Sequence, residues 1–187
     1  LIMFILLRSL SAVFATFLVM LFSIISGMGF SGWMGIPITP PSAIAPVVIM
    51  TLAIADSIHI LKSVFNALRE SMTKRDAIIE GLRVNLKPVF LTSATTIVGF
   101  LSLNFSDTPP FHDLGNVTSV GVAMAFVLSV TMLPAIMVLL PLKVRTSQNT
   151  QNQWGLRFGS WVTERRMIIA ISSSIVTILV GLQIPKM

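Results

Sequence analysis

The chain has 187 residues, of which 54% are hydrophobic and only 11% are charged, and its formal net charge is +6. A water-soluble domain carries roughly a quarter charged residues, so this composition excludes an ordinary soluble domain and indicates a membrane protein. The absence of cysteine excludes a disulfide framework, a thiolate metal site and a thiol nucleophile.

Five apolar stretches are long enough, or nearly so, to cross a bilayer, which takes about 20 helical residues. They cover residues 10–30, 42–61, 88–105, 117–142 and 167–184, and a shorter run at residues 1–7 is interpreted as the end of a truncated helix. Backbone groups in lipid must be hydrogen-bonded within their own segment, so these runs predict helices. The predicted fold is therefore all-α: a polytopic transmembrane bundle of about five full spans plus a truncated one.

The basic residues predict the orientation of these spans. Lysine and arginine lie before the first full span and in the connections at residues 62–87 and 143–166, whereas residues 31–41 and 106–116 contain neither. Basic residues concentrate on the cytoplasmic side of membrane proteins, so the basic connections are predicted to be cytoplasmic. Because these residues form short clusters between apolar runs, nucleic acid is not an expected partner.

The connection between the second and third spans is predicted to hold a short helix of its own. Thr73 followed by Asp76 fits a capping box, and apolar residues then repeat every four positions. We expect an amphipathic helix along the inner membrane face, with a new spanning helix that begins at Lys87-Pro88.

A stretch rich in Gln, Asn, Ser and Thr, from Thr146 to Gln153, is interpreted as a flexible linker. It divides the chain into three predicted parts: a transmembrane helix group at residues 1–145, a cytoplasmic linker at residues 146–166, and the start of a second transmembrane half at residues 167–187.

Asp56 lies in the second span, toward its predicted cytoplasmic half. An ionisable side chain near the centre of a spanning helix costs about 2.5–3.5 kcal/mol, and no Lys or Arg lies deep within another span to neutralise this one. An unpaired carboxyl group in hydrocarbon favours its neutral form, so Asp56 is interpreted as a proton relay. The alternatives are a structural aspartate that is hydrogen-bonded to a neighbouring helix, or a second span that is a core helix within the protein.

Four polar residues near Asp56 are candidates to support this relay. Ser57 is adjacent in sequence, and His59, one turn nearer the cytoplasm, either relays protons or extends toward the interface. The hydroxyls of Thr95 and Thr96 in the third span are expected to hydrate or hydrogen-bond Asp56. The alternative is that the small and hydroxyl residues of these spans form packing seams between helices.

The sequence predicts neither an enzyme nor a metal or cofactor site. Gly29-Phe30-Ser31-Gly32 is faintly similar to the Gly-x-Ser-Gly of intramembrane serine proteases, but the histidine nearest to Ser31 in depth, His112, lies in a predicted loop and not on a span where it could act as the base. His59 and His112 lie at opposite faces of the membrane and cannot share a metal ion. We expect His112 to be solvated in an outer loop.

Several short motifs succeed one another in an order typical of one family. They are Gly35-Ile36-Pro37-Ile38-Thr39, Ala55-Asp56-Ser57-Ile58-His59, the run from Lys87 to Thr96, Gly99-Phe100, Gly115, Gly121-Val122-Ala123 and Leu133-Pro134-Ala135. Over nearly the whole chain, this succession resembles the RND superfamily of exporters, in particular its MMPL-like branch, which shares the sterol-sensing-domain helix arrangement.

The resemblance implies a fragment of a twelve-helix protein of the cell (inner) membrane, from the end of its second helix to its seventh. Its partners would be the remaining half and the periplasmic domains of the same protein. The resemblance also allows a homo-oligomer. Family members commonly carry protons on an acidic residue of the fourth helix, which corresponds to Asp56. Many relatives place a second acid or a tyrosine beside it, where this chain has Ala55 and Ser57.

The function that this resemblance implies is proton-driven export of hydrophobic or lipid-like substrates. The alternative is a sterol- or lipid-sensing membrane module that regulates a partner without transport.

Overall fold

The structure, a computed structural model, describes residues 9–140, 161, 164, 165 and 167. The chain divides into two compact units, Leu1–Arg145 and Thr146–Met187. Within the described part of the second unit, the amide of Arg165 donates to the carbonyl of Trp161 at 3.1 Å. The truncated first helix, the predicted linker core at residues 146–153 and nearly all of the predicted fifth span lie outside the described residues.

The first unit is a bundle of four long helices with two short 3-10 turns among its described residues. The elements are α2 (Leu10–Met34), η1 (Ser42–Ile44), α3 (Ala45–Arg69), α4 (Lys74–Leu101), η2 (Ser102–Phe105) and α5 (Pro109–Leu139). Four segments, α2, η1 with α3, α4 with η2, and α5, are long and apolar enough to cross a membrane. The predicted helical membrane bundle is thus confirmed, with four of the five predicted spans described.

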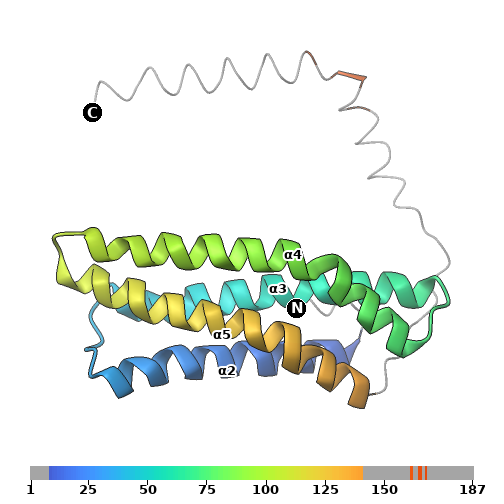
Figure 1. The fold of residues 1–187 in the computed structure, drawn as a ribbon, viewed down its shortest axis with the longest axis horizontal. Helices are drawn as coiled ribbons and strands as arrows, with labels where there is room; N and C mark the ends of the chain where they lie inside the picture. The colour runs from blue at the N-terminus through green and yellow to red at the C-terminus, as the bar shows by residue number, and fades with distance from the viewer. Residues whose placement is uncertain (1–8, 141–160, 162–163, 166, 168–187) are drawn as a thin grey trace. The chain divides into compact units, whose positions relative to one another are not determined.

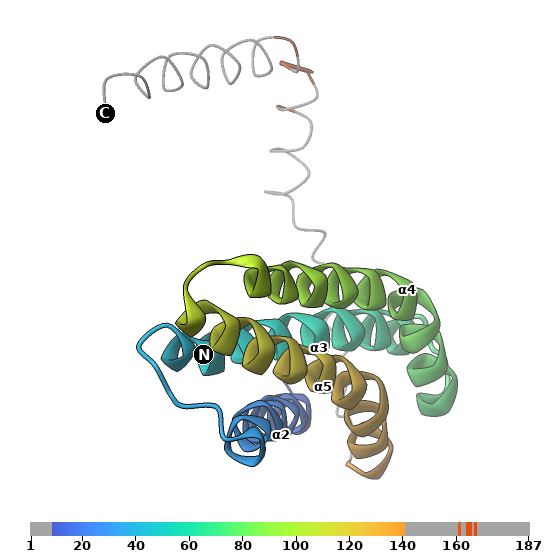
Figure 2. The ribbon, with the colours of Figure 1, turned by 60° about the vertical axis from the view of Figure 1, so that its left-hand side comes forward.

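Successive helices run in opposite directions, so the α2–α3 and α4–α5 connections share one end of the bundle and the α3–α4 connection lies at the other (Figure 1). Helix α3 packs against α2, α4 and α5, whereas α4 packs against α3 and α5 at the edge of the bundle (Figure 2). All six described lysines and arginines of residues 9–140 lie between Lys62 and Lys87. They therefore lie toward the end of the α3–α4 connection, which the positive-inside rule assigns to the cytoplasm.

Close contact between α2, α3 and α5 depends on glycine. A Cβ atom built on Gly27 would lie 2.8 Å from Cδ1 of Ile49 and 3.1 Å from the Cα of Gly121. Small residues let membrane helices approach in this way, and Ile49, which is fully buried, fills the space between them. The packing seam that the sequence offered as an alternative is therefore present on α5, where Gly121 is buried, but not on the third span, where Thr95 and Gly99 are exposed.

The outer ends of the helices differ in part from the prediction. The predicted turn after the first span is present: Gly35 ends α2 with φ 66°, a conformation that glycine adopts without steric cost. The loop predicted at residues 106–116 is mostly helix, because α5 begins at Pro109, a residue suited to a first helical turn. His112 is consequently not a solvated loop residue. It is partly buried, and its Nε2 lies 2.7 Å from the carbonyl oxygen of Ser106.

Helix α4 corrects a second prediction, since it does not begin at Lys87-Pro88 but runs through Pro88 from Lys74. Proline in a helix interior removes one hydrogen bond and clashes with the preceding turn, and α4 bends between its first turns and the rest (Figure 1). The predicted helix start at Thr73 is confirmed with one of the two bonds of a capping box: the Asp76 amide donates to Oγ1 of Thr73 at 3.3 Å. The Asp76 carboxylate accepts from the Thr73 hydroxyl, at 2.6 Å, and not from its amide.

Contacts with two other helices hold the first turns of α4 within the bundle. Nζ of Lys74 donates to the carbonyls of Val138 and Leu140, at 2.7 and 2.9 Å, and so caps the end of α5. Gly81 packs directly on Val64 of α3. These contacts explain why residues 74–87 continue into α4 as one helix and do not form a separate helix.

Candidate functional site

Asp56 lies at the middle of the segment that η1 and α3 form. This segment runs over 28 residues, from Ser42 to Arg69, and Asp56 is about 20 Å from either end at 1.5 Å per residue. The prediction from the sequence placed Asp56 nearer the cytoplasm because it ended this span at residue 61. The structure extends the helix by two turns and makes Asp56 central.

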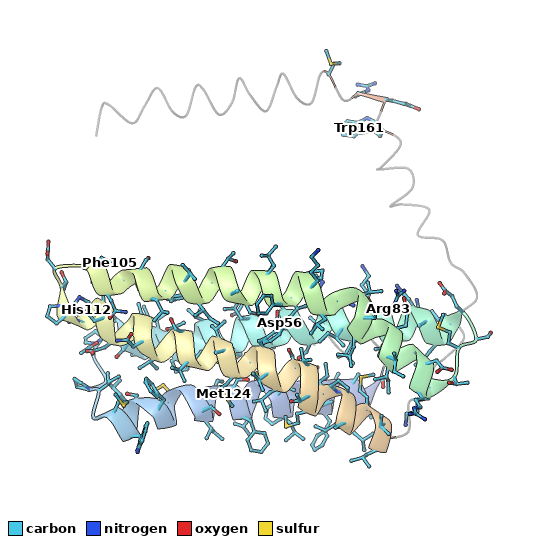
Figure 3. The ribbon with its side chains drawn as sticks, in the orientation of Figure 1. Asp56, Arg83, Phe105, His112, Met124 and Trp161 are labelled. Carbon is cyan, nitrogen blue, oxygen red and sulfur yellow. The ribbon has the colours of Figure 1, made fainter. Side chains whose placement is uncertain are left out.

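The carboxyl group of Asp56 is buried between α3 and α4, where Figure 3 labels it near the centre of the bundle. The side chain is 5% exposed, and its Oδ2 accepts a hydrogen bond from Oγ of Ser93 at 3.3 Å. Ser93, on α4, is itself 4% exposed. Within residues 9–140 no lysine or arginine forms an ion pair with Asp56. The next cation along its own helix, Lys62, is exposed and about 9 Å farther along the axis.

The residues expected to support Asp56 lie elsewhere. The hydroxyl of Ser57 is buried but donates to the carbonyl of Ala53, at 2.7 Å. His59 is exposed on the surface of the described bundle. Neither side chain forms a hydrogen bond with Asp56 in the described structure, and their part in proton movement stays a prediction.

The expected hydrogen bonds from Thr95 and Thr96 are corrected by the structure. Thr95 is exposed, and its Oγ1 donates to the carbonyls of Leu91 and Thr92 at 2.9 Å each. Thr96 donates to Thr92 at 2.8 Å. Both hydroxyls therefore bond to their own helix, as Ser and Thr commonly do with the preceding turn. The hydroxyl that reaches Asp56 is that of Ser93.

A second buried polar contact lies on the same α3–α4 interface, nearer the cytoplasmic end. Nδ2 of Asn85 donates to Oγ of Ser63 at 2.6 Å and to the carbonyl of Gly81 at 2.8 Å. Asn85 is 9% exposed. We call Asp56, Ser93, Ser63 and Asn85 the polar seam. Asn85 and Ser93 belong to one row of buried residues that repeats every four positions along α4, at Ala77, Gly81, Asn85, Val89 and Ser93.

This row is a readable signal in the sequence that the prediction missed. It is visible only when one helix is continued through Pro88, whereas the prediction starts a new helix there.

The chemistry of the polar seam depends on its hydrogen-bond donors. A serine hydroxyl can donate to a carboxylate or accept from a carboxylic acid, so Ser93 can serve Asp56 in both protonation states.

Comparison with known proteins gives one family and one relative. The family model described as "Sterol-sensing domain of SREBP cleavage-activation" matches residues 8–157, a range that includes the whole polar seam. A protein of Methanocaldococcus jannaschii, named as a membrane protein, is 31% identical over 128 residues, which cover 66% of this chain and 33% of the relative. The chain thus spans about a third of that relative's length. No solved structure matches the chain.

Proposed function

The chain belongs to the sterol-sensing domain family, and from this premise we propose that it is the membrane part of a proton-driven, RND-type exporter of hydrophobic or lipid-like molecules. Membership makes it a membrane module related to sterol or lipid handling. Export, coupling to protons and location in the cell (inner) membrane are the proposal. It assigns no enzymatic role to the chain, and the rest of the transporter comes from other parts of a longer protein.

The observation that carries the proposal is the buried carboxyl group of Asp56 in mid-span. A charge held there without a cation costs about 2.5–3.5 kcal/mol on the scale derived from helix insertion into membranes, which gives the lowest values for this cost. The neutral acid avoids this cost, so each change of protonation is a large change in free energy at the α3–α4 interface. Such a residue is a means of coupling proton movement to helix movement.

Ser93 is the contact through which this change reaches α4. A hydroxyl that donates to a carboxylate makes a charge-assisted hydrogen bond, roughly twice as strong as a neutral one, when the two oxygens close to about 2.5–2.7 Å from the 3.3 Å of this structure. Deprotonation therefore favours the α3–α4 contact and protonation weakens it. Pro88 removes one backbone hydrogen bond from α4 between its contacts at Ser93 and Asn85, and Asn85 lies on the cytoplasmic side of Pro88.

The test is to reconstitute the full-length protein in vesicles and measure export and proton uptake for Asp56→Asn. We expect both to fall to background, because asparagine keeps the shape of the side chain and can still hydrogen-bond, but it cannot take up and release a proton. Asp113→Asn at the outer end of α5 is the matched control and should retain both activities. Wild-type export by Asp56→Asn would reject the proton relay.

Sensing without transport is the second candidate, and the description of the matching family favours it. A sensor also needs helices that change their packing when a lipid binds, but it needs no proton flux. If proton uptake and export are absent in both Asp56→Asn and wild type, yet the variant changes binding of a partner protein, the sensing function replaces the transport proposal.

A further inference from the structure

A pocket of about 400 Å³ lies between α4 and α5, at the part of α4 on either side of Pro88. Its lining residues are Arg83, Leu86, Lys87, Phe90 and Phe126. The four α4 residues lie on one face of the helix at spacings of three and four. The volume lies within the range of small-molecule sites in proteins, about 300–1,000 Å³.

The apolar part of the pocket is built by two phenylalanines. The rings of Phe90 and Phe126 meet edge to face, with their centroids 5.7 Å apart and an angle of 62° between the ring planes. Edge-to-face contact is a favourable geometry for aromatic pairs, so it joins α4 to α5 at the base of the pocket. Leu86 and Phe90 remain 46% and 56% exposed, which leaves apolar surface for a hydrocarbon chain.

The polar part of the pocket is positive. Lys87 is exposed and makes no ion pair among the residues that the structure describes. Arg83 donates from Nε and Nη2 to the two carboxylate oxygens of Glu80, at 2.8 Å each. A guanidinium group has five N–H donors, so three remain for another acceptor. Figure 3 shows Arg83 toward the end of the α3–α4 connection, far from His112 at the opposite end.

We propose that this pocket binds an anionic phospholipid of the cytoplasmic leaflet, with its phosphate on Lys87 and Arg83 and an acyl chain along Leu86, Phe90 and Phe126. Two cations at the edge of an apolar pocket match one phosphate above one chain. Basic pockets between spanning helices on the cytoplasmic side favour anionic head groups, and juxtamembrane cations attract the negative leaflet. Such a site is inferred from the lining residues and the helix orientation, and not from proton transfer by Asp56.

Native mass spectrometry of the full-length protein, released from nanodiscs of mixed phosphatidylglycerol and phosphatidylcholine, measures the preference for the anionic lipid. We expect Lys87→Gln and Arg83→Gln each to lower the affinity for phosphatidylglycerol about fivefold and to leave that for phosphatidylcholine unchanged. Glu80→Gln should raise the affinity for phosphatidylglycerol, because it removes a competing carboxylate from Arg83. Lys87→Arg should retain binding, which would show that the loss in Lys87→Gln is due to charge.

The matched control is Lys62→Gln, an equal change of charge on α3 in the same cytoplasmic half of the bundle and outside the pocket. Equal losses for Lys62→Gln and Lys87→Gln would mean attraction to the whole basic surface and would overturn the specific site. Glycerol phosphate, which carries the head-group charge without acyl chains, should not displace the lipid at equal concentration. Displacement would assign the pocket to a free phosphate instead.

A photoreactive residue at Leu86 identifies the occupant directly. We expect cross-links to phosphatidylglycerol, and we expect Phe126→Ala to reduce them because it removes the wall against which the chain lies. Cross-links to another segment of the same protein, with none to lipid, would show that a helix covers the pocket and would overturn the proposal.

Discussion

Replacement of Gly81 by alanine tests the most consequential difference between the predicted and the observed fold, the course of α4. A Cβ atom at position 81 would lie 3.1 Å from the amide nitrogen of Val64 and 3.3 Å from its Cα, and would collide with the Val64 side chain. Because two of these contacts are to backbone, α3 and α4 must move apart. Overpacking of this kind costs about 1–3 kcal/mol in the free energy of unfolding.

Gly99, on the same helix, is the matched control, since nothing lies within 4 Å of a Cβ atom built there. Alanine improves helix propensity over glycine by about 1 kcal/mol at both positions, so the difference between Gly81→Ala and Gly99→Ala isolates the contact with Val64. We expect Gly99→Ala to be neutral or stabilising and Gly81→Ala to be less stable than it by about 1–3 kcal/mol. Reversible unfolding of the purified protein in mixed micelles, measured by circular dichroism, compares the two. Equal stability of the two variants would place residues 74–87 outside the bundle and contradict the observed course of α4.

Two further experiments test the buried and partly buried polar groups. Asn85→Ala and Ser63→Ala, combined in a double-mutant cycle, should show a coupling energy of about 0.5–1.5 kcal/mol in the free energy of unfolding, because a partly buried hydrogen bond joins the two side chains. Additive effects would show that the bond contributes nothing. Thr118→Val should leave stability unchanged or raise it, since Oγ1 of Thr118 is buried without a hydrogen-bond partner in the described structure, whereas Thr16→Val should lose about 1 kcal/mol because Thr16 donates to Ala12 at 3.0 Å.

Hydrophobic length predicts which segments cross the membrane, because backbone groups in lipid leave no alternative to helix. It does not predict where each helix ends. Helix α4 begins at Lys74, well before Pro88, because Lys74 contacts α5 and Gly81 contacts α3. Helix α5 begins at Pro109, although residues 109–116 are too polar to count as part of an apolar run. The first boundary depends on contacts with other helices and the second on a proline suited to a first helical turn, and a hydropathy pattern contains neither.

Asp56 could be found from the sequence because the cost of a charge in hydrocarbon is independent of fold. Its hydrogen-bond partner could not be chosen in the same way. Residues 92–96 of α4 include four hydroxyls, and rotation of the helix decides which one faces α3. That rotation is set by the contacts of Gly81 and Asn85, earlier in the same helix, so the choice of Ser93 over Thr95 and Thr96 requires one helix that continues through Pro88.

The proposed lipid pocket and the polar seam both involve the segment of α4 around its bend, on different faces of the helix. Lys87 immediately precedes Pro88, while Asn85 and Ser93 lie on either side of it. A lipid that binds one bent form of α4 more tightly also favours the Asp56–Ser93 geometry of that form, and linkage makes the effect reciprocal. Affinity for the anionic lipid must then depend on whether Asp56 carries a proton, so Asp56→Asn should change it while Asp113→Asn does not. In transport this coupling would lead to proton flux, and in sensing it would lead to the docking of a partner. Both functions require the coupling itself.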